Sequence, residues 1–212
     1  MVPEIRKKYN SEFTQEKYSS FVKDLNTTYD FPIEFRIAET PIFIGKEFKN
    51  EILKAVDEIT SYLMSDDYKK LSLGAIPKGM EVPNDPGYPA MMAIDFAICK
   101  DEKGNFIPQL IELQGFSSLF FFELLQNYMF RKHFEIDERY GGLFNIHIPD
   151  KYLDILKRVI VADNHPDNVI LLEIEPEKQK TRIDFECCYT YLGVKPVCLT
   201  KITKQGKELF YD

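Results

Sequence analysis

Residues 93–114 read AIDFAICKDEKGNFIPQLIELQ, two apolar runs on either side of the polar sequence KDEKGN. Glycine and asparagine in that polar sequence favour a tight turn, so the two runs are predicted to pair as an antiparallel hairpin. Each run carries one carboxylate, Asp95 and Glu112, and burying an unpaired charge among apolar residues is costly. Each carboxylate is therefore expected to have a partner, which is a metal, a cation or a ligand.

The register of this hairpin decides which side chains meet. A turn centred between Lys103 and Gly104 places Asp95 opposite Glu112, where cross-strand Cβ atoms lie roughly 5 Å apart. Gln114 shares a face with Glu112, because side chains alternate along a strand. The opposite face is expected to be core and holds the apolar residues Ile94, Phe96, Ile98, Ile111 and Leu113. A register error of one residue would separate the two carboxylates.

Two carboxylates and an amide oxygen on one face suit a hard cation such as Mg²⁺. Asp95, Glu112 and Gln114 are therefore the candidate metal ligands. Ser117 or Ser118 is expected to cap a helix over residues 119–134, whose first N–H groups would be free to bind an anion. An alternative left open by the spacing is that the carboxylates bond to a neighbouring lysine, arginine or backbone group.

The remaining segments predict helices and further strands. Apolar residues at helical spacing predict helices from Ser11 to about Asn26, over 46–64 and over 149–161. Residues 31–44 alternate and predict a pair of short strands, and the proline- and glycine-rich residues 74–89 predict a loop. The run Val169–Ile174 predicts an interior parallel strand, covered by a helix from about Lys178 to Leu192 that ends at Gly193. Val197 and Leu199 are expected to continue the sheet beside it, and the last residues to form a hairpin.

The fold predicted from these elements is an α/β fold with a mixed sheet. It combines a helical N-terminal portion, an antiparallel hairpin and a C-terminal βαβ unit. The chain of 212 residues is long enough for one substantial core. A single domain over residues 1–212 is expected, divisible into sub-lobes 1–140 and 141–212.

Composition limits the partners. The net charge of −7 would repel a phosphate backbone, so no nucleic acid partner is expected. The N-terminus has no apolar segment typical of a signal peptide, and no run reaches the roughly 18 apolar residues of a membrane span. Four cysteines without metal spacing, Cys99, Cys187, Cys188 and Cys198, are interpreted as reduced and mostly buried thiols. A cytoplasmic protein without a membrane partner is therefore expected.

At the hairpin the sequence resembles the glutathionylspermidine synthase-like, circularly permuted ATP-grasp enzymes. That family carries an Arg-Phe-Asp strand, a turn, and a Glu-Tyr-Asn strand followed by Asp-Thr-Pro-Thr-Ser-Leu, where this chain has AIDF, KDEKGN and IELQGFSSL. The resemblance implies that Asp95, Glu112 and Gln114 match the Mg²⁺ ligands. It also implies that Ser117 and Ser118 lie beside the nucleotide phosphates. It covers residues 40–212, with specific motifs in 93–119.

Two departures from the family pattern affect the expected activity. Ala93 stands where the family has an arginine thought to stabilise the transferring phosphoryl group, and Gln114 replaces an asparagine. The lobes that clamp ATP would follow the last residue of this chain. The resemblance therefore implies the pre-ATP-grasp front part of a carbon–nitrogen ligase, expected to be inactive alone. Full enzymes of this kind use ATP and Mg²⁺ to phosphorylate a carboxylate, which an amine then attacks to give an amide.

The substrate implied by the resemblance is a small carboxylate and amine or a peptide-like molecule. The ATP-grasp lobes would come from a continuation of the chain or from a partner. An alternative is a non-catalytic, stand-alone binding module that kept the fold, with an apolar C-terminal strand that seeks a partner chain. A third interpretation is a metal-dependent nuclease, because Asp95, Glu112 and Gln114 resemble a D…E-x-K core on a hairpin. That core usually has lysine in the third place, and the negative charge also argues against it.

Overall fold

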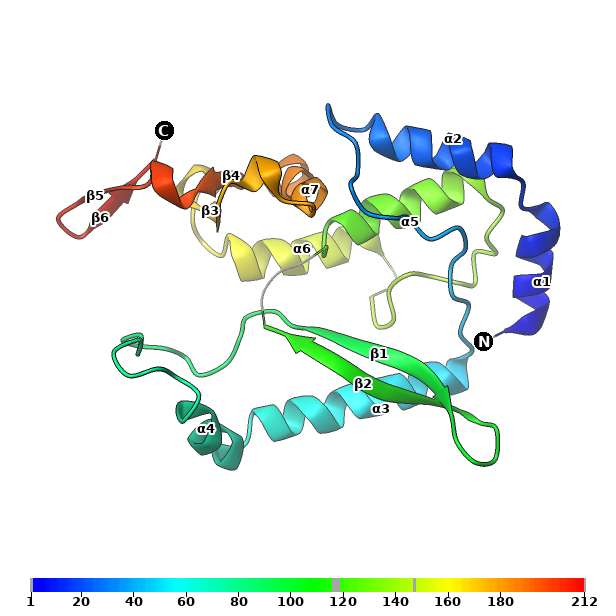
Figure 1. Cartoon of the computed structure of the whole chain (residues 1–212), viewed down its shortest axis with the longest axis horizontal. Helices are drawn as coiled ribbons and strands as arrows, with labels where there is room; N and C mark the ends of the chain where they lie inside the picture. The colour runs from blue at the N-terminus through cyan, green and yellow to red at the C-terminus, as the bar shows by residue number, and fades with distance from the viewer. Residues whose placement is uncertain (1, 116–118, 147, 212) are drawn as a thin grey trace. The chain divides into compact units, whose positions relative to one another are not determined.

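The computed structural model describes residues 2–115, 119–146 and 148–211. The chain divides into two compact units, one made of Met1–Val2 with Ile44–Ser117 and the other of Pro3–Phe43 with Ser118–Asp212. The described residues contain helices and three two-stranded sheets, two antiparallel and one parallel, which confirms the mixed α/β class (Figure 1). The single-domain prediction stays a prediction, and each unit is described by itself.

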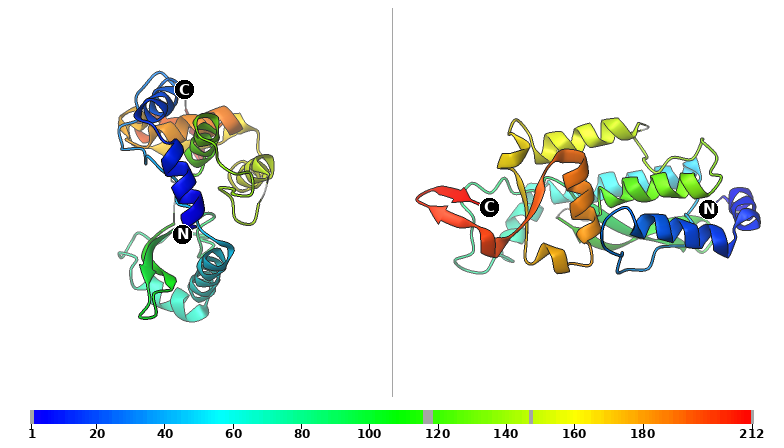
Figure 2. Two further views of the ribbon diagram at one scale, coloured as in Figure 1. Left: turned by 90° about the vertical axis from the view of Figure 1, so that its right-hand side faces the viewer. Right: turned by 90° about the horizontal axis from the view of Figure 1, so that it is seen from above.

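The first unit is a hairpin with one long helix against it. Its elements are α3 (Lys46–Leu63), α4 (Asp66–Leu73), β1 (Ala93–Lys100) and β2 (Phe106–Gln114). The helix predicted over 46–64 is confirmed as α3, which lies alongside the hairpin (Figure 2) and places the buried Phe48 ring 6.0 Å from that of Phe106. The loop predicted over 74–89 is confirmed. The short helix α4 was not predicted, and it begins where the Ser65 hydroxyl accepts a hydrogen bond from the Tyr68 N–H at 3.2 Å.

The second unit is mainly helical and carries two small sheets. Its helices are α1 (Pro3–Glu12), α2 (Gln15–Asn26), α5 (Phe122–His133), α6 (Pro149–Ile160) and α7 (Arg182–Leu192), and its strands are β3 (Ile170–Glu173), β4 (Lys195–Cys198), β5 (Thr203–Gln205) and β6 (Glu208–Phe210). Aromatic rings hold α2 against α5, with the Phe21 and Phe130 centroids 4.5 Å apart. Phe21 is fully buried. The predicted helix over 149–161 and the C-terminal hairpin are confirmed.

The helix predicted from Ser11 to about Asn26 begins only at Gln15, as α2, and a separate helix α1 precedes it. Ser11 does not cap it but lies in the last turns of α1, where its hydroxyl donates to the Lys8 carbonyl at 2.7 Å. The cap of α2 is Thr14, whose hydroxyl oxygen accepts from the Lys17 N–H at 3.2 Å. Two helices therefore replace the single predicted one. The second begins after Thr14, which lies three residues beyond Ser11, because the Thr14 side chain caps it.

The predicted strands over residues 31–44 are wrong. This segment is irregular, and its prolines Pro32 and Pro41 remove two backbone donors that a sheet would need. Tyrosines of α1 and α2 bond its carbonyl groups instead. The Tyr9 hydroxyl donates to the Glu39 carbonyl at 3.0 Å, and the Tyr18 hydroxyl donates to the Ile37 carbonyl at 2.7 Å.

The C-terminal βαβ unit is confirmed, since β3 and β4 are parallel and α7 connects them. The interior position of residues 169–174 is wrong, because the sheet has two strands and each is an edge. Leu172 is 52% exposed as a result. Val197 lies in β4 as expected, but the sheet does not continue to Leu199, which begins a short 3-10 helix. The helix predicted from Lys178 begins only at Arg182.

Gly193 ends α7 in the left-handed conformation, with φ of 74°, as predicted. We expect Gly193→Ala to lower the free energy of unfolding by about 1 kcal/mol, because a Cβ atom disfavours this conformation. An added Cβ would also lie 3.4 Å from the Pro166 side chain. Urea denaturation measures the loss. Gly74→Ala is the matched control, since Gly74 follows α4 in the right-handed conformation, and an equal loss there would contradict the explanation.

Candidate functional site: the carboxylate face of the β1–β2 hairpin

The predicted pairing of the two carboxylates is confirmed. Asp95 of β1 lies directly opposite Glu112 of β2 in an antiparallel register, and Ala93 lies opposite Gln114. Alternation along the strands then defines the carboxylate face, whose residues around the carboxylates are Ala93, Asp95, Ala97, Gln109, Glu112 and Gln114. The small side chains of Ala93 and Ala97 flank Asp95 on this face.

The register shifts once, immediately beside the carboxylates. Asp95 pairs with Glu112 but Phe96 pairs with Leu110, so Ile111 is an extra residue of β2 without a partner. This arrangement is a β-bulge, which disrupts the ladder locally and increases the twist of the hairpin. The predicted place of Ile111 in a core face is therefore wrong, and its side chain is 65% exposed.

The environment of the carboxylates is more open than predicted. Asp95 and Glu112 are both exposed, so water solvates them and burial does not require a partner. Behind them Ile94 is half-buried, whereas Leu113 is 39% exposed. The expected core behind the site is thus incomplete. The helix α3 packs against β2, where Phe48 contacts Phe106.

No lysine or arginine neutralises these carboxylates among the residues that the structure describes. Asp95 has no hydrogen-bond or ion-pair partner there, and Glu112 accepts a hydrogen bond from the Gln114 side-chain amide. The nearby ammonium group of Lys100 lies on the opposite face, 5.5 Å from the centre of the Phe106 ring. The alternative in which a basic side chain pairs with the carboxylates therefore finds no support in the described part of the hairpin.

The donor set allows a cation but does not form a conventional cluster. The described residues contain no group of three or more histidine, cysteine, aspartate or glutamate side chains that could hold a metal ion. A cation on the carboxylate face would thus need amide oxygens besides Asp95 and Glu112. Gln114 would have to turn its carbonyl oxygen toward the ion, since its nitrogen faces Glu112.

The predicted anion site at Ser117 and Ser118 lies outside the described residues and stays a prediction. The start of α5 is described, and two N–H groups there already have an acceptor. The Asp184 carboxylate accepts hydrogen bonds from Phe121 N–H at 2.8 Å and from Phe122 N–H at 2.7 Å. This side chain of α7 therefore already provides the negative charge that a helix N-terminus favours.

Asp184 is the one charged residue that is buried among the described residues, at 2% exposure. Burial raises the pKa of its carboxyl group, and the backbone hydrogen bonds from Phe122, Phe121 and Leu119 act in the opposite direction. Sequence reasoning missed this residue. The available signal was an acidic residue between Ile183 and Phe185 in an apolar helix, which predicts a buried charge but not its partner.

The cysteines of the described structure are mostly buried. All four are free thiols, and Cys187, Cys188 and Cys198 are buried. Burial raises the pKa of Cys187 and of Cys188 to about 12, so both thiols stay protonated and unreactive at neutral pH. The reading as reduced, mostly buried thiols agrees with these positions.

Within the described segments, none of the helices has the length and apolar character needed to cross a membrane. We compared the chain with protein-family models, with curated proteins and with solved structures, and none of the three comparisons found a match.

Proposed function

We propose that this chain is the front part of an ATP-grasp-type carbon–nitrogen ligase, in which the carboxylate face binds Mg²⁺. The observation that carries the proposal is the register of the hairpin, which places Asp95 opposite Glu112 with Gln114 two residues away. Oxygen ligands of this kind suit Mg²⁺. The bulge beside the pair gives further support, because bulges often occur next to active sites, where they re-aim a side chain.

In such a ligase the bound metal neutralises charge on ATP while a carboxylate substrate is phosphorylated and an amine then displaces the phosphate. Asp95 and Glu112 would hold the cation, and Gln114 would contribute a neutral oxygen. The substrates would be a small carboxylate and amine or a peptide-like molecule. The lobes that clamp ATP would come from further sequence or from a partner.

We expect Mn²⁺, used as a probe for Mg²⁺, to raise the thermal unfolding midpoint of this chain. A cation at about 100 times its dissociation constant adds about 2.7 kcal/mol to the free energy of unfolding. Asp95→Ala and Glu112→Ala should abolish this gain, and Gln114→Ala should reduce it, because a neutral oxygen binds a hard cation more weakly. Differential scanning fluorimetry with and without Mn²⁺ measures these shifts.

Glu102→Ala is the matched control, since Glu102 is an exposed acidic residue in the turn of the same hairpin. Its shift with Mn²⁺ should equal that of the wild type. Equal shifts in Asp95→Ala, Glu112→Ala and Glu102→Ala would show that the metal binds elsewhere, and the proposal would be wrong.

A second candidate function is a non-catalytic binding module of the same fold. The observation that favours it is the occupation of the α5 N-terminus by Asp184, which leaves less positive potential for a nucleotide phosphate there. Binding of Mn²⁺ separates the two functions. Stabilisation by Mn²⁺ that Asp95→Ala and Glu112→Ala abolish would favour the ligase, whereas a wild type that Mn²⁺ does not stabilise would favour the module.

A further inference from the structure

We propose that helix α6 is a docking surface for an acidic amphipathic helix of a partner protein. The helix belongs to the second unit and lies at its periphery (Figure 2). Its residues take no part in the carboxylate face, so the inference is independent of the proposed function. It rests on an apolar stripe of α6, on an adjoining groove, and on two cations of that groove.

One side of α6 attaches the helix to the second unit, and a neighbouring apolar stripe stays open to solvent. Leu156 is only 3% exposed, and the Tyr152 hydroxyl donates to the Phe120 carbonyl at 3.3 Å. Ile148, directly before the helix, and Val159 are instead 48% and 40% exposed. The apolar surface of α6 therefore extends beyond the part that its own unit buries.

A groove of about 370 Å³ adjoins this stripe, and it is lined by α6 and by residues that precede the helix. Its apolar part consists of Ile146, Ile148 and Ile155. Ile155 is half-buried and lies two helical turns after Ile148, on the same side of α6. A groove of this kind accepts the apolar side chains of an amphipathic helix, which docks through residues at helical spacing.

Two cations line the same groove, Lys151 and Arg158. Neither side chain has a hydrogen-bond or ion-pair partner among the residues that the structure describes. Asp154 is the acidic residue of the lining, and the two cations outnumber it. The excess of positive charge in this groove is opposite in sign to the net charge of −7 of the chain. It would attract an acidic partner and repel a basic one.

The spacing of these residues favours a partner of different sequence over a second copy of this chain. In coiled-coil notation Ile148 and Ile155 take position d, and Val159 takes position a. Lys151 and Arg158 both take position g, beside this apolar seam. Two antiparallel copies would place these cations against each other, because g then faces g. Two parallel copies would place them against position e, which is the buried leucine of α6. A helix with glutamate or aspartate beside its own apolar seam avoids both conflicts.

The test measures the binding of synthetic helical peptides to the whole chain by fluorescence anisotropy. The probe is a three-heptad peptide with leucine at a and d and glutamate at e and g, and its counterpart has lysine at e and g. We expect the wild type to bind the acidic peptide and not the basic one, with an affinity that falls as salt is added. The double variant Lys151→Glu with Arg158→Glu should bind the acidic peptide roughly tenfold more weakly and should gain binding of the basic peptide.

Lys157→Glu is the matched control, because Lys157 is an exposed cation of the same helix that does not line the groove. It should bind the acidic peptide as the wild type does. Ile148→Ala removes an exposed side chain of the groove, so it should weaken peptide binding while the thermal unfolding midpoint stays unchanged.

A change of preference from the acidic to the basic peptide in the double variant would support the inference, because a folding defect cannot reverse a charge preference. Absence of binding by the wild type, or equal binding of the acidic peptide by the double variant, would overturn it. Binding of phosphatidylserine vesicles in place of the peptide would assign α6 to a membrane surface instead. Dimerisation that Ile148→Ala abolishes in sedimentation velocity would assign the stripe to a second copy, and would also overturn the inference.

Discussion

Asp184→Ala should lower the free energy of unfolding by about 3 kcal/mol. The substitution leaves the N–H groups of Phe121 and Phe122 without their acceptor at the buried start of α5, where both residues are nearly inaccessible to water. Each buried, unsatisfied donor costs about 1–3 kcal/mol, and the helix also loses a cap. Relief of the buried charge offsets part of this loss. Urea denaturation monitored by circular dichroism measures the change.

Glu186→Ala is the matched control, because Glu186 is an acidic residue of the same helix α7 without the role at α5. Its effect should stay within about 0.5 kcal/mol of zero. Asp184→Asn should retain much of the stability, since its carbonyl oxygen can still accept from both N–H groups. A loss in Asp184→Ala no larger than that in Glu186→Ala would contradict the capping role.

The pH dependence of stability offers a separate check on Asp184. Burial raises the pKa of this carboxyl group above its ordinary value, so the folded state binds the proton more tightly than the unfolded state does. Its contribution to stability is therefore fully present below about pH 3.9 and is lost as the pH rises through the folded-state pKa. Relative to Asp184→Asn, which does not ionise, the wild type should lose stability as the pH rises above about 3.9. A difference between the two proteins that does not change with pH would contradict the raised pKa.

Phe21→Ala should cost about 3–5 kcal/mol, which is the range for removing a buried phenylalanine. Phe21 is fully buried, and its ring lies 4.5 Å from that of Phe130 and 6.0 Å from that of Phe134. Its loss would leave a cavity between α2 and α5, the two helices that these rings hold together. Thermal and urea unfolding measure the loss, and the α2 amides should lose most of their protection from hydrogen exchange.

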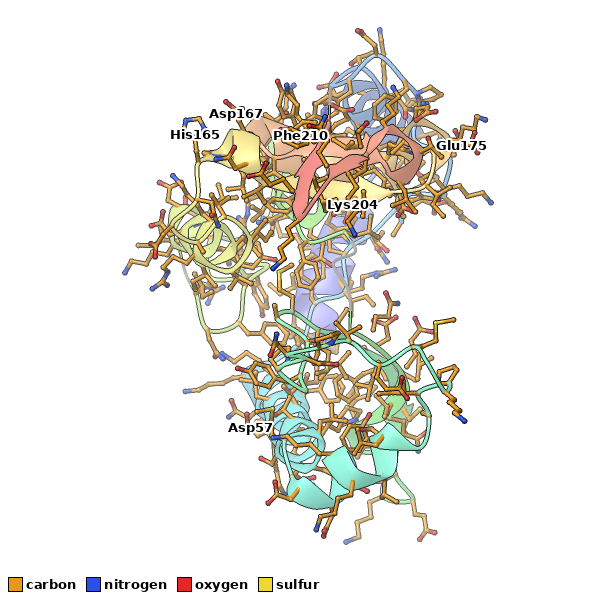
Figure 3. All side chains as sticks on the ribbon, turned by 90° about the vertical axis from the view of Figure 1, so that its left-hand side faces the viewer. Asp57, His165, Asp167, Glu175, Lys204 and Phe210 are labelled. Carbon is orange, nitrogen blue, oxygen red and sulfur yellow. The ribbon has the colours of Figure 1, made fainter. Side chains whose placement is uncertain are left out.

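Phe210→Ala is the control for this substitution. Phe210 lies on the C-terminal hairpin (Figure 3) and is 45% exposed. Its removal should therefore cost less than about 1 kcal/mol, because little apolar surface returns to water. Similar losses in the two variants would show that the ring cluster around Phe21 does not stabilise the second unit.

The elements that could be predicted are those with local signals. A turn sequence between two apolar runs was enough to pair Asp95 with Glu112, and helical spacing was enough to place α3. The strands predicted over 31–44 failed because alternation appeared in a segment where Pro32 and Pro41 prevent pairing. The position of β3 failed for a different reason. An apolar run indicates a buried strand, but the number of strands in the sheet depends on distant residues.

The same difference between local and distant signals applies to the candidate site. The positions of Asp95, Glu112 and Gln114 could be predicted because they lie in one hairpin and follow the alternation of side chains along its strands. The place of Gln109 on this face could not be predicted, because it depends on the one extra residue of the β-bulge. The adjacent apolar residues Leu110 and Ile111 indicate that the alternation of side chains is interrupted, but not at which residue. Asp184 could not be linked to α5 because its hydrogen-bond partner Phe121 is 63 residues away in sequence.

The division of the chain into units has a consequence for its synthesis on the ribosome. The Asp24 side chain of α2 bonds to His133 of α5, 109 residues later, and the Ile44–Ser117 part of the first unit is translated between them. At roughly 5–20 residues per second, α2 waits about 5–20 s for its partner helix. During that interval the apolar side of α2, including Phe21, has no α5 to cover it, while α3 and then the hairpin are completed before α5 is. Chaperones that bind nascent chains should therefore contact the N-terminal helices longest, and the first unit should acquire structure before them.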